Sequence, residues 1–334
     1  MKIKPTQRIE FIDSVKGFAI FCVLWGHCIQ YLKDNADFFH NPVFEFIYSF
    51  HIPLFFVVSG FFFKSSLKLN YKDFFQKKFF QLLLPCIIWL FYLYIIHIAK
   101  YFYTRTAIDW NAELQFFLNL PGWPFWFLRD LFLSYSIAFI AFKILKKEWM
   151  AFVCSILAVF LIPGFSMQQF LFPFFWIGIF LKDNYPFVRE HLKWFLWGSG
   201  IVFLSCLFFW KGDFTIYVTI QQDITNLNIS LFRLLIGFAG SLFFFTLFQK
   251  LYKENKFWSY LSVIGTHTLS IYILQWVILE QILARVLDFS TMNNWIFNLL
   301  ITPFIAFIVL CVCMVIIKQM KNKYLRLLVL GSKD

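Results

Sequence analysis

The sequence predicts an all-α fold, a polytopic membrane bundle of about ten transmembrane helices that forms one domain over residues 1–334, with both termini in the cytoplasm. Of the 334 residues, 60% are hydrophobic and only 14% are charged, whereas soluble domains carry about 25% charged residues. Apolar runs of about 20 residues, the length that crosses a bilayer as a helix, recur along the whole chain. Basic residues alternate between the connecting segments as the positive-inside rule requires. We expect no appended soluble catalytic domain.

Ten apolar segments, taken in order, are expected to cross the membrane. Each is long enough, or nearly so, to span the hydrocarbon as a helix. The two longest polar stretches, 103–123 and 211–228, are expected on the outer side and are too short to form domains. The expected spans are residues 13–33, 43–63, 80–102, 124–144, 149–165, 168–182, 193–211, 229–250, 262–284 and 295–317.

The distribution of basic residues sets the expected orientation. With the N-terminus in the cytoplasm, most of the 30 lysine and arginine residues lie on the cytoplasmic side, and an odd number of spans would destroy this asymmetry. The net charge of +12 therefore forms a cytoplasmic rim that attracts anionic lipid, and we expect no nucleic-acid partner. Lys2, Lys4 and Arg8 precede the first apolar segment, which lacks a small-residue cleavage site and is typical of a signal anchor.

The seven cysteines give no sign of a metal site or a disulfide framework. All lie in apolar stretches, and none forms a CxxC motif or a Cys/His cluster with metal-ligand spacing. We interpret them as buried structural thiols, and no metal ligand is expected.

The first apolar segment carries two ionisable residues, Lys16 and His27. Eleven residues make about three helical turns, so the two side chains share one face and lie roughly 16 Å apart. Ionisable groups in a membrane helix are costly and indicate a functional site. Histidine, with an ordinary pKa near 6.5, suits removal of a hydroxyl proton at neutral pH. Lys16, near the cytoplasmic interface, could meet a phosphate or pair with Asp13 on the same helix.

Further ionisable side chains are expected at about the depth of His27, in the outer half of the bilayer. At 1.5 Å per residue they lie roughly 6–12 Å below the outer ends of their helices. Because charged groups in hydrocarbon must pair or face water, a shared polar cavity is predicted. His51 could instead bond between helices. Adjacent residues on a helix point to different sides, so we expect Arg129 and Asp130 to pair with other helices. The members of this layer are His51, Arg129, Asp130 and Arg233.

Four motifs follow one another along the chain: RIEFIDSVKGFAIFCVLWGH (8–27), SFHIPLFFVVSGFFF (49–63), PFWFLRDLF (124–132) and IGTHTLSIYILQ (264–275). With these motifs the chain resembles the acyltransferase-3 family of integral-membrane enzymes, and in particular its compact bacterial members related to the fucose 4-O-acetylases. The resemblance covers essentially the whole chain. Lys16 and His27 occupy the family's basic position and its histidine, with ten residues between them.

The resemblance implies an O-acetyltransferase in the bacterial inner (cytoplasmic) membrane, with no permanently bound cofactor and with acetyl-CoA as co-substrate. The implied acceptor is a sugar hydroxyl of a surface or lipid-linked glycan, such as O-antigen in lipopolysaccharide, capsule or exopolysaccharide. His27 would act as catalytic base or as acyl carrier, and Arg129 or His51 would stabilise the oxyanion. The expected catalytic residues are His27, His51, Arg129 and Asp130, and the expected donor-binding residues are Lys16, Lys78 and Ser59.

The chain departs from the family pattern at two places. Members often carry an Arg-x-x-Arg pair before the third helix, where this chain has Lys78 and Gln81. Lys78 keeps the charge without the guanidinium fork. Members also often carry a histidine after the Ser-Leu-x-Ile-Tyr stretch, where this chain has Gln275, so no catalytic role is carried over to that position.

Two other classes of function remain open from the sequence. One is a transporter of a sugar or polyprenyl-linked glycan, which ten spans and a buried polar layer would also fit. No inverted repeat or pair of broken helices supports it. The other is an exporter that hands acetyl groups to a separate transferase.

Overall fold

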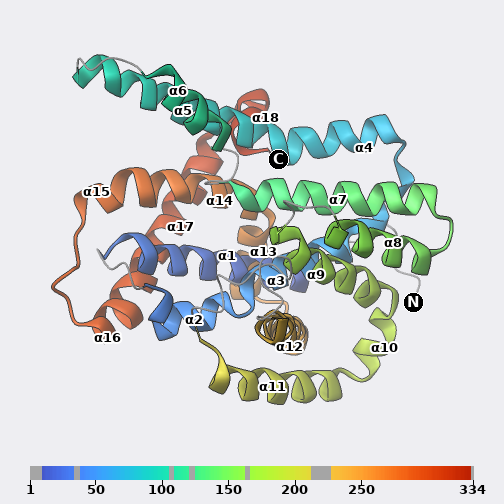
Figure 1. The fold of residues 1–334 in the computed structure, drawn as a ribbon. Coiled ribbons are helices and arrows are strands. Elements are labelled where there is room, and N and C mark those ends of the chain that lie inside the picture. The colour runs from blue at the N-terminus through green and yellow to red at the C-terminus, as the bar shows by residue number, and fades with distance from the viewer. Residues whose placement is uncertain are drawn as a thin grey trace.

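The computed structural model describes residues 10–33, 38–104, 109–119, 125–161, 166–211 and 227–331. Within these ranges all regular structure is helical, as predicted (Figure 1). The basic residues at positions 2–8 and most of the polar stretch 211–228 lie outside the described residues. The helices are α1 (Glu10–Tyr31), α2 (Pro42–Tyr48), α3 (His51–Phe61), α4 (Tyr71–Lys78), α5 (Leu84–Thr104), α6 (Trp110–Asn119), α7 (Trp126–Ile144), α8 (Glu148–Leu161), α9 (Ser166–Asp183), α10 (Tyr185–Glu190), α11 (Leu192–Phe209), α12 (Leu227–Leu251), α13 (Lys256–Thr266), α14 (Thr268–Trp276), α15 (Ala284–Val286), α16 (Asn294–Ile296), α17 (Thr302–Gln319) and α18 (Lys323–Leu330).

Seven segments of the described chain are long and apolar enough to cross a membrane. This makes the chain a multi-pass membrane protein. The other three predicted spans correspond to α7, α8 and α9, of which α8 has only 14 residues. The count of ten therefore stays a prediction. The seven segments are Glu10–Tyr31, Pro42–Lys68, Tyr71–Ala99, Leu192–Phe209, Leu227–Leu251, Thr268–Val286 and Asn294–Gln319.

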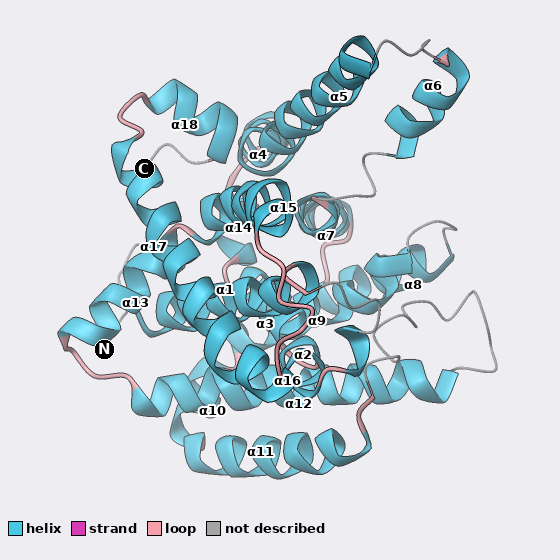
Figure 2. Cartoon of the chain, turned by 90° about the vertical axis from the view of Figure 1, so that its left-hand side faces the viewer, coloured by secondary structure: helices cyan, strands magenta, loops and turns pink. Residues whose placement is uncertain are grey.

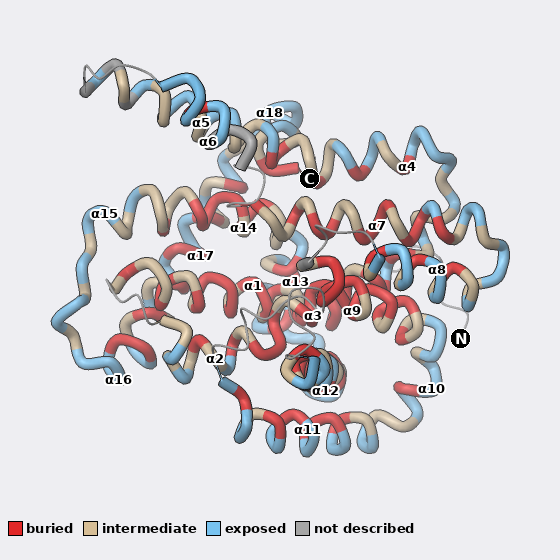
Figure 3. The backbone as a smooth tube through the Cα atoms, in the orientation of Figure 1, coloured by how far each residue is buried: buried red, intermediate tan, exposed pale blue. Residues whose placement is uncertain are grey.

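Helix α1 forms the centre of the bundle and contacts α3, α12, α13, α14 and α17. Figure 3 shows it largely buried, whereas α5, α6 and the outer face of α11 are exposed. The crossing with α13 depends on two glycines. A Cβ at Gly265 would come within 1.7 Å of the Asp13 carbonyl oxygen, and a Cβ at Gly17 within 2.2 Å of the Leu261 carbonyl oxygen. Small residues thus allow a close backbone approach, which fixes the part of α1 that carries Lys16.

The second predicted span is one apolar segment but two helices, because the chain breaks between α2 and α3 at residues 49–50. Pro53 supplies the physical reason. It has no N–H to donate to the carbonyl of Ser49, and its ring crowds that carbonyl. The break places His51 at the first position of α3. The expected span 43–63 is therefore corrected to a broken helix.

Two π-helical segments precede prolines. In Phe79–Leu83 and Phe297–Ile301 the closing N–H donates to a carbonyl five residues back, and Pro85 or Pro303 comes two residues after the segment ends. A proline in the next turn lacks its own donor, and the wider turn relieves the clash with the preceding carbonyl. The first of these segments immediately follows Lys78, and Gln81 lies within it.

The periphery consists of helices that leave the central bundle. Figure 2 shows α5 and α6 projecting away from it and α11 lying along α12. Helix α18 covers the start of α5, where Trp89 Nε1 donates to the carbonyl oxygen of Val329 at 2.9 Å. Gly331, the residue after the end of α18, has a positive φ of 68° and packs against Gln81 and Pro85.

Candidate active site

A cavity of about 400 Å³ opens among α1, α3, α7 and α14. It brings together five of the seven residues to which the sequence gave a catalytic or donor-binding role, from segments far apart in the chain. Helix α1 supplies two of them, α3 supplies two, and the last residue of α4 is the fifth. These five lining residues are Lys16, His27, His51, Ser59 and Lys78.

Lys16 marks one end of the cavity. Its Nζ lies 2.6 Å from Oδ1 of Asp13, which confirms the pairing that the sequence left as an alternative. The Lys16 side chain remains partly exposed and still lines the cavity. An ammonium has three donors, so the contact with Asp13 leaves others for an anionic ligand.

His27 is held by a hydrogen bond that fixes its tautomer. Its Nδ1 lies 2.9 Å from Oε1 of Gln275. The amide orientation of Gln275 is itself set, because its Nε2 donates to the carbonyl oxygen of Tyr272, which can only accept. Oε1 therefore faces His27 and must accept from Nδ1–H. The neutral ring then carries its lone pair on Nε2, as a general base requires.

His51 adopts a different arrangement. Its Nδ1 lies 2.7 Å from the carbonyl oxygen of Ile47, one turn earlier across the helix break. A carbonyl only accepts, so Nδ1 carries the proton and the neutral ring has no donor on Nε2. The bond therefore joins α3 to α2 across the break, within one apolar segment. In this state His51 cannot donate to an oxyanion from Nε2, and the expected oxyanion role is not supported.

Lys78 and Ser59 are joined through Tyr135. Lys78 is buried, and its Nζ lies 3.3 Å from the centroid of the Tyr135 ring. The Tyr135 hydroxyl donates to the carbonyl oxygen of Ser59 at 3.1 Å. A cation over an aromatic face is stabilised without a carboxylate. The ammonium of Lys78 is thus held at the cavity wall with its charge available to a ligand.

Arg129 and Asp130 are not among the residues that line the cavity. They pair with each other, with Nε of Arg129 2.8 Å from Oδ1 of Asp130, so the expectation that adjacent residues would not pair is wrong. The Asp130 carbonyl oxygen also accepts from Gln168 of α9, which in turn accepts from Ser134. This network ties α7 to α9. Arg129 and Asp130 are therefore assigned to the packing of α7 against α9, and we propose no catalytic role for them.

Three functional candidates received no role from the sequence. In the sequence, Gln275 is only a departure from a motif, and Arg233 is distinguished only by its predicted depth in the membrane. The buried Arg233 guanidinium lies 3.9 Å from the Phe170 ring centroid and lines the cavity. The centroids of the Tyr48 and His51 rings lie 4.6 Å apart, and Tyr48 lines the cavity. No signal distinguishes Tyr48 among the 51 phenylalanines and 14 tyrosines.

The cavity is cationic along its described lining. Lys16, Lys78 and Arg233 line it, and no aspartate or glutamate does so within the part of the chain that the structure describes. Nor do the described residues hold a group of three or more His, Cys, Asp or Glu side chains that could bind a metal ion. A cationic cavity with apolar walls suits a ligand that has anionic groups at one end and an uncharged body.

Comparison with known proteins places the chain in a family. The acyltransferase-3 family, described as an acyltransferase domain, matches residues 9–318. The chain belongs to the acyltransferase-3 family. The match confirms the resemblance carried by the four motifs, and it spans the five cavity-lining residues named above.

Among curated relatives of this acyltransferase-3 member are two proteins named nodulation protein NolL. The protein from Sinorhizobium fredii (strain NBRC 101917 / NGR234) is 26% identical over 206 residues, which cover 58% of this chain and 53% of the relative. The protein from Mesorhizobium japonicum (strain LMG 29417 / CECT 9101 / MAFF 303099) is 28% identical over 175 residues, which cover 50% and 46%. The chain thus spans about half the length of the curated relatives it matches. No solved structure matches it.

Proposed function

We propose that the chain is an O-acyltransferase of a bacterial cytoplasmic membrane that moves an acetyl group from cytosolic acetyl-CoA to a sugar hydroxyl of a surface or lipid-linked glycan. The observation that carries this proposal is one cavity in which His27 presents Nε2 as an acceptor and a cationic region lies about 16 Å away along α1. Membership in the acyltransferase-3 family supports the reaction type.

The donor would lie along α1. Its phosphates would meet Lys16 and Lys78, the ammonium groups at the predicted cytoplasmic side of the cavity. The extended pantetheine arm is uncharged and has a length comparable to the rise between Lys16 and His27. The walls beside α1 are apolar, with Ile20 and Val23 between the two ionisable positions. A thioester would thus reach His27 without exposing the donor's phosphates to hydrocarbon.

In the proposed transfer His27 acts as the general base. Nε2 of His27 takes the proton of the acceptor hydroxyl as the hydroxyl oxygen attacks the thioester carbonyl. The tetrahedral intermediate collapses, the carbon–sulfur bond breaks, and the CoA thiolate takes the proton back from the imidazolium. Gln275 would stabilise the imidazolium by continuing to accept from Nδ1–H. The oxyanion would be stabilised by the hydroxyl of Tyr48, a neutral donor in the cavity lining.

Purified protein in lipid nanodiscs tests the proposal directly. The donor is acetyl-CoA labelled in the acetyl group, and the acceptor is the deacylated surface glycan purified from cells that lack the chain. We expect labelled glycan and an equal amount of free CoA with no second protein present. Thioester cleavage only when a second protein is added would support an acetyl exporter. Movement of glycan without any thioester cleavage would support a transporter, and either result would overturn the proposal.

A further inference from the structure

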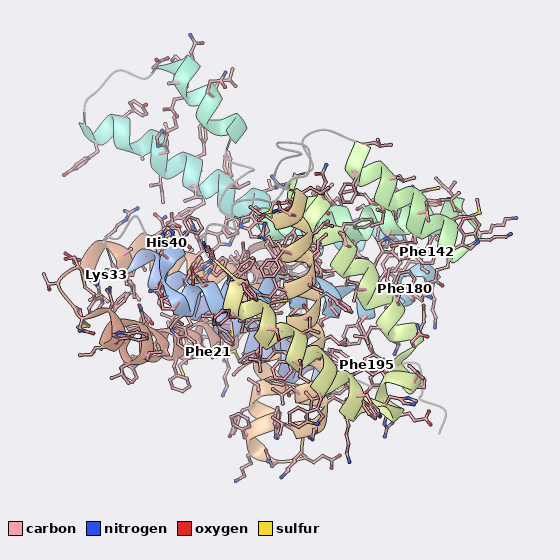
Figure 4. All side chains as sticks on the ribbon, turned by 60° about the horizontal axis from the view of Figure 1, so that its bottom comes forward. Phe21, Lys33, His40, Phe142, Phe180 and Phe195 are labelled. Carbon is pink, nitrogen blue, oxygen red and sulfur yellow. The ribbon has the colours of Figure 1, made fainter. Side chains whose placement is uncertain are left out.

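A second cavity, of about 260 Å³, lies at the end of α1 beyond His27. The end of α1, the start of α2, α16 and the π-helical segment Phe297–Ile301 form its walls. All of these positions belong to the predicted outer side of the membrane. Figure 4 shows Lys33 and His40, two of its lining residues, at the same edge of the molecule.

The second cavity adjoins the larger cavity that His27 lines. Phe38 lines both of them, and its ring packs against Phe44, which lines only the larger one. Lys33 follows His27 by six residues and lies just past the end of α1 at Tyr31. A ligand in the second cavity would therefore lie on the opposite side of His27 from Lys16 and the donor's proposed phosphate site.

The second cavity contains side-chain amides whose N–H groups are available to a ligand. Asn298 is 4% exposed, and its Oδ1 accepts from Nδ2 of Asn41 at 2.8 Å. This bond fixes the orientation of the Asn298 amide. Its Nδ2 is therefore left to donate, and it has no acceptor within the described residues. Asn294 is arranged in the same way, because its Oδ1 accepts from Lys33 at 2.6 Å.

The charge and aromatic content of this cavity differ from those of the donor region. Lys33 is its one lysine or arginine among the described lining residues, and two neutral oxygens, those of Met292 and Asn294, hold its ammonium. Trp295 lines the cavity and is 63% exposed. Amide donors beside an open indole face suit an uncharged polyol, whose hydroxyls accept hydrogen bonds and whose ring face stacks on the indole.

We propose that this second cavity binds the sugar acceptor, with the pyranose ring against Trp295 and its hydroxyls bonded to the amides of Asn298 and Asn294. This inference rests on the proposed transferase function and adds the acceptor's binding site to it. The acceptor would approach His27 from the outer side while the donor approaches from the cytoplasmic side. Phe38 lies between the two cavities and would contact the bound sugar.

Two variants and one control test the site in the same nanodisc assay, with the deacylated glycan as acceptor. Trp295→Ala removes the stacking face. Asn298→Asp keeps the oxygen that accepts from Asn41 and replaces the free donor. Each is expected to raise the KM for glycan about tenfold, with the KM for acetyl-CoA unchanged. Trp110→Ala is the control, because Trp110 is also an exposed tryptophan on a predicted outer segment but lies outside both cavities.

The outcomes separate this inference from the proposed function. An unchanged KM for glycan in both variants would overturn the acceptor site while leaving the transferase intact. Equal effects of Trp295→Ala and Trp110→Ala on KM or on membrane insertion would assign Trp295 to the membrane interface and would also contradict the site. No transfer by the wild-type protein would instead refute the proposed function.

Discussion

At the scale of single residues, the contact between Gln275 and His27 decides which ring nitrogen can act as a base. The sequence showed both residues but no link between them, since 248 positions separate them along the chain. Replacing Gln275 by Leu removes the acceptor of Nδ1–H and frees the ring to rotate or change tautomer. We expect kcat to fall roughly 10²-fold while the KM for acetyl-CoA stays the same.

A conservative replacement provides the control for this effect. Gln275→Glu retains an oxygen acceptor for Nδ1–H and should restore most of the lost kcat, with an altered pH profile. A residue that only fills space would give similar rates for Leu and Glu. Equal loss in both variants would therefore contradict the positioning role of Gln275.

The charge of Lys78 offers a second residue-scale prediction. Lys78 is buried against Tyr135 and lines the cavity, whereas its neighbour Lys77 is exposed and does not. We expect Lys78→Gln to raise the KM for acetyl-CoA about tenfold, because it removes one ammonium from the proposed phosphate site. The matched variant Lys77→Gln should leave this KM unchanged. Equal KM values in the two variants would remove Lys78 from the donor site.

At the scale of elements, the crossing of α1 and α13 depends on Gly265 as much as on apolar area. A Cβ at Gly265 would meet the Asp13 backbone, which cannot yield as a flexible side chain can. We expect Gly265→Ala to destabilise the protein by about 1–3 kcal/mol, measured as a lower midpoint of thermal unfolding in detergent. Gly198→Ala on α11 is the control, because nothing lies within 4 Å of its Cβ position. Equal midpoints for the two variants would contradict this account of the crossing.

Some features of the helices could be predicted from the sequence, and others could not. The length of the apolar segments was enough to predict an all-helical membrane bundle and the place of His27 within α1. Pro53 could have indicated the break before His51, because a proline weakens the turn before it. The pairing of Arg129 with Asp130 depends on side-chain rotamers and on Gln168 from another helix. Such tertiary contacts leave no periodic pattern in the sequence.

At the scale of the whole molecule, the positive-inside rule predicts ten spans with both ends in the cytoplasm. Within its described residues the structure shows seven segments that are both long and apolar enough to span a membrane, so α7, α8 and α9 decide the count. Alkaline-phosphatase fusions test it, since the reporter is active only outside the cytoplasm. We expect activity for a fusion in the outer stretch 103–123 and none for a fusion after Gln319. An active reporter after Gln319 would require an odd number of spans.

In the proposed mechanism, donor and acceptor meet at His27 from opposite sides of the membrane. The most direct test is acetyl transfer to glycan by His27→Ala in nanodiscs, compared with His191→Ala, a histidine outside both cavities. The account predicts no labelled glycan from His27→Ala, with an unchanged unfolding midpoint, and wild-type transfer from His191→Ala. Undiminished transfer by folded His27→Ala would contradict the central claim.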